Sequence, residues 1–105
     1  LVLYPLEDWS KVEEQLTKLS SIRGRHRSFV RSVTRYATSV QYDGQGRIQI
    51  PDSLLGYSGI KKDVAVIGRI NKIELWDPNI ISKIDASEEG LDDNSFDDLA
   101  NEINF

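Results

Sequence analysis

The spacing of the apolar residues changes at Tyr36, and this change limits the folds that the chain can adopt. Before Tyr36, apolar side chains recur three or four residues apart, which is the spacing of one face of an α-helix. After it they alternate with polar residues, as in a strand, on both sides of the glycine-bracketed turn in YDGQGRIQIP. The sequence therefore predicts an α+β fold in which helices precede strands joined by short turns.

The same patterns locate the individual elements. Helices are expected over residues 9–19 and 25–35, with Phe29 and Val33 of the second helix turned inward. The remaining elements are a strand end over 1–4, strands over 36–42 and 48–50, a short helical turn from Pro51 that ends near Gly56 or Gly59, strands over 64–68 and 73–76 about a turn at Asn71-Lys72, and a weak helix from Pro78 to Ile84.

Two segments of the chain resemble each other. LVLYPLEDW at the start and KIELWDPNI near the middle both read as an apolar strand that ends in an aromatic residue, then a proline and a helical segment. This echo indicates a repeat of roughly 70 residues whose first copy is missing, so that Leu1–Tyr4 is the last strand of a preceding unit. The first residue is not methionine, and we expect a cut or processed chain with sequence upstream.

The composition is that of one globular domain. A chain of 105 residues is expected to bury about two thirds of its unfolded surface in a modest core. No apolar run approaches the roughly 20 residues that cross a bilayer, and no secretion signal is visible, so neither a membrane segment nor export is expected. The absence of cysteine excludes disulfides, zinc fingers and thiol catalysis.

The net charge of -4 is unevenly distributed. The segment that ends at Lys83 carries all 13 basic residues and 9 acidic ones, which gives +4. The remaining residues carry 8 acidic side chains and no basic one, which gives -8. We therefore expect a basic folded part and an acidic tail over residues 85–105, which is mobile or forms a short amphipathic helix.

The turn that precedes Arg47 has a structural and a functional interpretation. Gly44 and Gly46 can supply positive φ angles in a hairpin and Asp43 can cap it, which explains the turn without a ligand. Arg47 follows directly on the face opposite Ile48, so its guanidinium should project beside the tip. Such a planar fork fits two acceptors of a guanine in the major groove, or one phosphate.

The basic segment RGRHRSFVRSVTR is a second candidate site. A basic run of this kind is usually a solvated helix face. Arg27, Arg31 and Arg35 lie four residues apart, however, and no acidic residue occurs between Glu14 and Asp43 to balance them. The pattern favours contact with an anion, or with acidic residues of a neighbouring subunit.

Other chemistry has little support. His26 is the single histidine and has no second ligand at a suitable spacing, so neither a metal nor a cofactor is expected. Asp43 and Asp52 could imitate a catalytic carboxylate pair, but a turn and a helix cap explain them better. Neither a glycine-rich phosphate loop nor a nucleophile elbow occurs, so we expect no enzyme and no small-molecule substrate.

Together these stretches resemble the MraZ family, bacterial transcription regulators of the AbrB-like swapped-hairpin superfamily. Asp43-Gly44-Gln45-Gly46-Arg47 matches the D-x-x-x-R signature of that family. LVLYPLEDW, YATSVQYDGQGRIQIP and AVIGRINKIELWD follow the order of its second half. The resemblance covers about residues 1–78, and the first unit of the family, with its own D-x-x-x-R, is not present.

The resemblance implies a particular architecture. It is one AbrB-like swapped-hairpin β-barrel unit with two flanking helices, together with the final strand of a preceding unit. Residues 1–35 would hold that end strand and the two helices, residues 36–84 the DNA-binding (SpoVT-AbrB) unit, and residues 85–105 the tail.

The resemblance also implies a function. The protein would be a cytoplasmic, nucleoid-associated regulator, expected to be a repressor, that binds direct repeats of promoter DNA upstream of the division and cell-wall genes as a ring-like homo-oligomer. Arg47 would read base edges, Asp43 would brace the loop, and Gly44, Gln45 and Gly46 would approach the phosphates. The alternative that the residues leave open is an assembly module that does not bind DNA, in which the arginine helix pairs with acidic residues of a neighbouring subunit.

Overall fold

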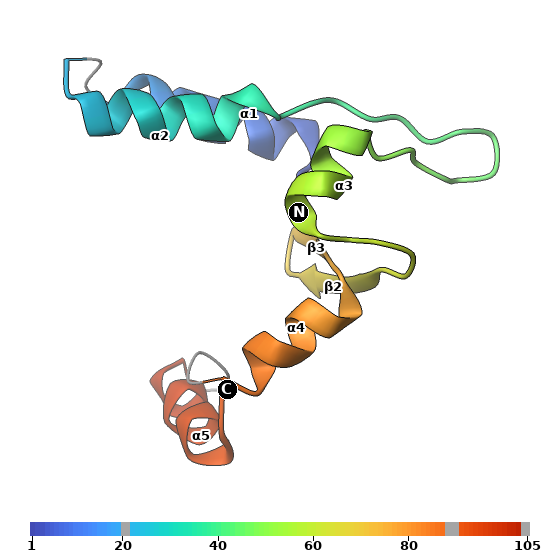
Figure 1. Cartoon of the computed structure of the whole chain (residues 1–105). Helices are drawn as coiled ribbons and strands as arrows, with labels where there is room; N and C mark the ends of the chain where they lie inside the picture. The colour runs from blue at the N-terminus through green and yellow to red at the C-terminus, as the bar shows by residue number, and fades with distance from the viewer. Residues whose placement is uncertain (20–21, 88–90, 104–105) are drawn as a thin grey trace.

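The chain folds into a small sheet from which helices and one long irregular segment extend (Figure 1). The computed structural model describes residues 1–19, 22–87 and 91–103. This mixture of helices and a small antiparallel sheet confirms the predicted α+β class. In chain order the elements are β1 (Val2–Leu3), α1 (Leu6–Thr17), α2 (Gly24–Arg35), α3 (Asp52–Ser58), β2 (Ala65–Arg69), β3 (Lys72–Trp76), α4 (Pro78–Asp85) and α5 (Asp93–Glu102).

Strand β3 lies in the middle of the sheet, with β1 on one side and β2 on the other, and both pairings are antiparallel. Leu3 of β1 and Gly68 of β2 both pair with Ile73. The amide of Leu75 donates to the carbonyl of Leu1 at 2.8 Å, which continues the β1 edge. The strands predicted for these three segments are confirmed.

The turn between β2 and β3 consists of Ile70 and Asn71, because Arg69 and Lys72 pair directly. The predicted turn at Asn71-Lys72 is wrong by one residue. Asparagine is a common turn residue, whereas Ile70 adopts φ 61°, which a β-branched residue rarely takes. The Ile70 side chain is also fully exposed (106 %), so no packing offsets this backbone strain.

The two segments that echo each other in the sequence pair with each other in the sheet. β1 is followed by a proline and α1, and β3 is followed by a proline and α4. The first predicted helix is confirmed but begins earlier, at Leu6, because Pro5 already has a φ of -58° and Glu7 and Asp8 suit the positive end of the helix. The predicted second helix and the weak helix after Pro78 are also confirmed.

Helices α3 and α4 meet where α3 ends. Gly59 closes α3 with a left-handed φ of 74°, which decides between the two predicted stops. A Cβ atom at Gly59 would lie 2.9 Å from Cδ1 of Ile80 in α4, so a larger residue would separate the two helices. The carboxylate of Asp77 accepts a hydrogen bond from the amide of Asn79 at 2.9 Å and caps α4.

The chain buries far less than the single core that its length predicts. Leu75 (6 % exposed) and Asp77 (7 %) are the only buried residues in the described ranges. The accessible surface is 9052 Å², whereas a compact monomer of 11.9 kDa exposes about 6000 Å². The radius of gyration is 16.8 Å, compared with about 13 Å for a compact domain of this length. The expected core is therefore incomplete within one copy of the chain.

The strands predicted over 36–42 and 48–50 are absent from the structure. Residues 37–50 leave α2, turn back at Asp43–Arg47 and return to α3 as an extended loop (Figure 1). One backbone hydrogen bond, from the amide of Asp43 to the carbonyl of Arg47 (2.8 Å), joins the two arms at the tip. Two strands without a third neighbour are only marginally stable in water, and no described strand lies beside either arm.

The acidic tail contains a helix, α5, which was one of its two predicted forms. The Asp92 carboxylate caps α5 by accepting from the amide of Ser95 at 2.7 Å, and this hydrogen bond lowers the pKa of Asp92. Leu99 on the helix and Ile103 directly after it are exposed, while Phe105 lies outside the described residues. Within the described ranges, no helix has both the length and the apolar character needed to cross a bilayer.

Candidate nucleic-acid interface

Asp43 organises the tip of the loop through its side chain. Its Oδ1 atom accepts hydrogen bonds from the amides of Gln45 (2.8 Å) and Arg47 (2.9 Å). The carbonyl of Asp43 accepts from the amide of Gly46 at 3.1 Å, and Gly46 has a left-handed φ of 77°. The turn is therefore fixed by local contacts even though its arms do not form a sheet.

The second oxygen of Asp43 holds the side chain of Arg47. Nε of Arg47 donates to Oδ2 at 2.9 Å, and 71 % of the arginine side chain remains exposed. Within the described residues the terminal nitrogens Nη1 and Nη2 have no hydrogen-bonding partner. Asp43 thus orients the guanidinium and leaves the two donors that form a parallel fork open to solvent.

The charge of Asp43 is stabilised by the same geometry. The amides of Arg47 and Gln45, and then the Arg47 side chain, lower the pKa of the carboxyl group below its ordinary value. The carboxylate therefore stays ionised at neutral pH and keeps its hold on Arg47.

Gly44 is not explained by the loop itself. It does not adopt a positive φ, and a Cβ atom placed on it would meet nothing within 4 Å. A larger residue would therefore fit in this chain. The small residue is useful where another molecule approaches the backbone closely.

The arginines of α2 differ in their surroundings. Nη1 of Arg27 donates to the carbonyl of Ile22 at 2.7 Å, so this side chain folds back on the start of the helix. The guanidinium of Arg35 lies 5.3 Å from the ring centre of Tyr36, which itself stacks on Tyr57. Arg31 is exposed and has no hydrogen bond or ion pair with any described residue.

The structure does not bring the two candidate regions together. The tip that carries Arg47 and the helix α2 lie on opposite sides of α3 in Figure 1. Asp43, Gly44, Gln45, Gly46 and Arg47 form one cluster, and Arg27, Arg31 and Arg35 form a separate row. In one copy of the chain they are two surfaces rather than one site.

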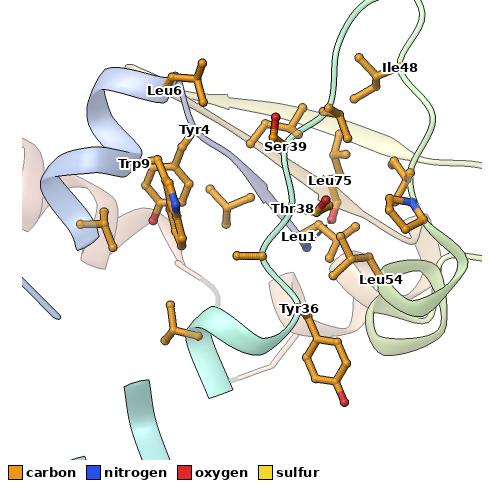
Figure 2. A pocket seen from close by; sticks show the side chains of 18 of the residues that line it. Leu1, Tyr4, Leu6, Trp9, Tyr36, Thr38, Ser39, Ile48, Leu54 and Leu75 are labelled. Carbon is orange, nitrogen blue, oxygen red and sulfur yellow. Dashed lines mark hydrogen bonds between the residues drawn. The ribbon is translucent and has the colours of Figure 1, made fainter. Parts of the chain in front are cut away.

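A groove between these two regions was not predicted from the sequence. It has a volume of about 600 Å³ and no charged side chain in its lining. Figure 2 shows side chains of α1, of the loop and of α3, among them Trp9, Ile48 and Leu54, around it. Phe29 and Val33, which were expected to point inward, both line it. The alternation of apolar and polar residues on either side of the turn was the signal that could have indicated it, because the apolar side chains need a surface to pack against. Its lining also includes Leu1, Trp9, Val40, Ile48, Ile50, Leu54 and Leu75.

His26 and the carboxylates do not form a further site. Nδ1 of His26 is buried without a partner, but no other ligating residue accompanies it in the hollow beside α2. In the described part of the chain, no group of three or more histidine, cysteine, aspartate or glutamate side chains could hold a metal. Asp43 lies at the turn, as expected, and accepts from the amide of Gln45. The cap expected of Asp52 is wrong, because Pro51 occupies the N-cap position of α3 and Asp52 lies in the first turn without capping it.

Comparison with known proteins identifies the family. The family model described as "MraZ protein, putative antitoxin-like" matches residues 34–103, which include the Asp43–Arg47 turn. The chain belongs to the MraZ family. The match continues through β2, β3 and α4 into α5, so the acidic tail of this MraZ chain also falls within the family model.

Curated relatives carry the name "Transcriptional regulator MraZ". The relative from Shewanella sediminis is 38 % identical over 99 residues, which are 93 % of this chain and 65 % of the relative. That from Halothermothrix orenii is 45 % identical over 76 residues, 72 % of this chain and 53 % of the relative. The MraZ chain thus spans about half to two thirds of the length of these relatives. No solved structure matches it significantly.

Proposed function

We propose that the chain binds double-stranded DNA as a transcription regulator and that the Asp43–Arg47 turn reads the sequence. The observation that carries this proposal is the Arg47 side chain, which is fixed through Nε at 2.9 Å while 71 % of the side chain stays exposed. Two parallel donors match the O6 and N7 acceptors of guanine in the major groove. The names of the relatives and the D-x-x-x-R signature support the same function.

The neighbours of Arg47 in the turn have supporting roles in this proposal. Asp43 keeps the guanidinium in one orientation, which reduces the entropy lost on binding. Gly44 and Gly46 allow the backbone, with the Gln45 amide group, to come close to phosphates. Because the turn is closed by its own hydrogen bonds, it can enter a groove without support from the rest of the chain.

The arginine row of α2 contributes contacts to phosphates. Arg31 and Arg35 are exposed, and such contacts position a protein on DNA without reading its sequence. Arg27 is partly committed to Ile22 and contributes less. Since this row lies apart from Arg47 in one copy, the two surfaces contact separate parts of the DNA.

Assembly completes the DNA-binding unit, residues 36–84, in this proposal. The apolar groove and the open arms of the loop are covered when strands from another chain pair with residues 37–50, which is the swapped-hairpin barrel of the family. The accessible surface and the radius of gyration both exceed those of a compact monomer, which supports this view. A ring-like oligomer would place several tips along DNA, which suits short direct repeats upstream of division and cell-wall genes and a nucleoid-associated repressor in the cytoplasm.

Substitution of Arg47 tests the reading of bases. Duplexes selected by the chain from a randomised pool serve as cognate DNA and are compared with random duplex. Arg47→Lys keeps the charge but loses the fork, so affinity for the selected duplex should fall by about 1–3 kcal/mol per site while random duplex is bound almost as before. Titration on a duplex with one repeat avoids the amplification that linked sites produce.

Arg69→Lys is the matched control. Nε of Arg69 also contacts a carboxylate, that of Glu74 at 3.2 Å, but Arg69 lies on strand β2 and not in the turn. The control should leave both affinities unchanged. If Arg47→Lys weakens selected and random duplex equally, Arg47 contacts only phosphate. If it changes neither affinity, the turn has only a structural role and the proposal is wrong.

A further inference from the structure

Two helices of this chain carry equal and opposite charge. α2 contains four arginines and no acidic residue, and α5 contains four acidic residues and no basic one. All eight of these charged side chains are exposed. The separation of charge seen along the sequence is therefore concentrated on two helical surfaces.

Each helix bears repulsion that its own sequence does not relieve. Arg27, Arg31 and Arg35 are spaced four residues apart, and so are Asp93 and Asp97, and like charges at this spacing destabilise a helix. The ion pairs Asp8–Lys11, Asp43–Arg47 and Arg69–Glu74 all lie outside these two helices. A surface of opposite charge would relieve this repulsion on both helices.

The two charged rows match in spacing. Residues four apart on a helix rise about 6 Å, so the acidic row of α5 and the basic row of α2 have the same repeat when the helices lie side by side. Leu99 on α5 and Ile103 directly after it are exposed, at 47 % and 72 %. The aliphatic parts of arginine side chains can cover such apolar residues while their charged ends meet carboxylates.

The α2 helix that α5 can reach belongs to another copy of the chain. Figure 1 shows that α4 leads away from α1 and α2, so α5 lies on the far side of the sheet. Seven residues separate Asp85 from Asp93 and span at most about 25 Å. The molecule is 41 Å across its longest dimension, so a return past the sheet to its own α2 is disfavoured.

We propose that α5 of one copy packs along the arginine row of α2 in a second copy and so covers the cations that contact phosphate. The contact links copies of the chain and competes with DNA for the same side chains. The competition rests on the function proposed above, whereas the contact between α5 and α2 does not.

Engineered cysteines test the contact directly, because the chain has no cysteine of its own. Thr34→Cys lies beside the arginine row and Asn101→Cys extends the acidic row by one turn, and both positions are exposed. The two variants are mixed at low salt with a short bis-maleimide. A product of twice the 11.9 kDa chain mass that joins the two variants is expected, and it should decrease as salt rises.

Two controls make this result specific. Gln15→Cys on the exposed surface of α1 replaces Thr34→Cys in a matched mixture and should give little product. Asp93→Asn with Asp97→Asn, added to the Asn101→Cys chain, should remove most of the product, whereas Glu13→Gln with Glu14→Gln, which changes the net charge equally on α1, should not. Equal products in all mixtures would overturn the proposal.

A chain that carries both Thr34→Cys and Asn101→Cys distinguishes contact within one copy from contact between copies. Linkage within single chains that is independent of concentration, with no linked pairs, would show that α5 reaches its own α2 and would overturn the proposal. Linked pairs that increase with concentration support it.

Competition with DNA is measured separately. Asp93→Asn with Asp97→Asn should tighten binding to random duplex at low salt by about two- to thirtyfold, the range for two exposed ion pairs. The Glu13→Gln with Glu14→Gln chain corrects for the change in net charge. Linked pairs without any DNA binding would contradict the proposed function but leave the contact standing, and equal tightening in both double variants would overturn the competition.

Discussion

Two segments of this chain have the sequence pattern of a β-hairpin, and only one of them is a hairpin in the structure. β2 and β3 pair over five residues each, with β1 along the free edge of β3. Residues 36–50 alternate in the same way, yet the backbone hydrogen bond that joins their two arms in the described structure lies at the tip. Neighbouring strands and burial, rather than alternation or turn residues, decide which pattern becomes a sheet.

The segment that stays open has the less strained turn, and the segment that forms the hairpin has the more strained one. Asp43 and Gly46 give the open loop a turn without strain, whereas Ile70 holds a left-handed conformation at the tip of the real hairpin. The β2–β3 hairpin forms despite its turn, because β1 and the buried Leu75 stabilise it. The open loop has no neighbouring strand among the described residues and remains extended despite a favourable turn.

The largest expected effect is on folding stability, which should depend more on a residue of the β2–β3 hairpin than on a residue of the open loop. Leu75→Ala should lower the free energy of unfolding by about 2–5 kcal/mol, because Leu75 is buried at the centre of the sheet. Ile48→Ala in the open loop should cost less than about 1 kcal/mol in a single copy, since Ile48 is only half-buried. Urea unfolding followed by circular dichroism at low protein concentration measures both.

A similar loss of stability in both variants would show that the loop packs as firmly as the sheet. A cost of Ile48→Ala that grows with protein concentration would instead show that a second copy covers the loop. The first result would remove the difference in packing between the two segments, and the second would show that this difference holds only in a single copy.

The sequence was informative where an element depends on residues close to it in the chain. The helices at α1, α2 and α4, the stop at Gly59 and the Asp43 turn follow from local spacing, caps and turn residues, and all were predicted as elements. The groove and the missing strands depend on what lies beside Val40 and Ile48 in space, and local spacing contains no information on that. Asp43 was expected to cap the turn, and its hydrogen bonds to the amides of Gln45 and Arg47 do so. Its ion pair with Arg47 and the separation of Arg47 from α2 follow only from the fold.

A second prediction concerns the open loop as an interface. The chain should self-associate at micromolar concentration, and Ile48→Asp should weaken this association at least tenfold, about 1.4 kcal/mol, because it places a charge in the apolar groove. Gln49→Asp is the control, since Gln49 is exposed and does not line the groove.

Sedimentation at high salt is the suitable measurement, because contacts between exposed charges are then screened and the groove is tested alone. A wild-type chain that sediments as a monomer of 11.9 kDa at micromolar concentration would contradict the prediction. The same weakening in both variants would assign the effect to charge rather than to the groove.

A third prediction concerns the strained tip of the real hairpin. Ile70→Asn should raise the free energy of unfolding by about 1 kcal/mol, because asparagine tolerates the left-handed conformation that Ile70 is forced to adopt. Val66→Asn, at an exposed position inside β2, is the control and should lower stability, since asparagine is a poor strand residue. Equal losses in the two variants would mean that the Ile70 side chain has a partner in solution.

The smallest expected effect concerns the unstrained tip, where the pH dependence of Asp43 is informative. Its pKa lies below 3.8, mainly through the Arg47 and Gln45 amides, so its ionised form stabilises the turn at all pH values above 3.8. As the pH falls through the lowered pKa, the carboxyl group takes up a proton and the contacts with Nε of Arg47 and with the Gln45 amide weaken. Nuclear magnetic resonance of these two groups should show one shared transition below pH 3.8.

The amide of Leu75 reports on the sheet in the same spectra and should change at a different pH, because the turn is held by its own contacts. In Asp43→Asn the shared transition should disappear while the Leu75 signal behaves as before. A transition of all three groups together would show that the tip depends on the sheet, and the contrast between the two hairpin segments would then be wrong.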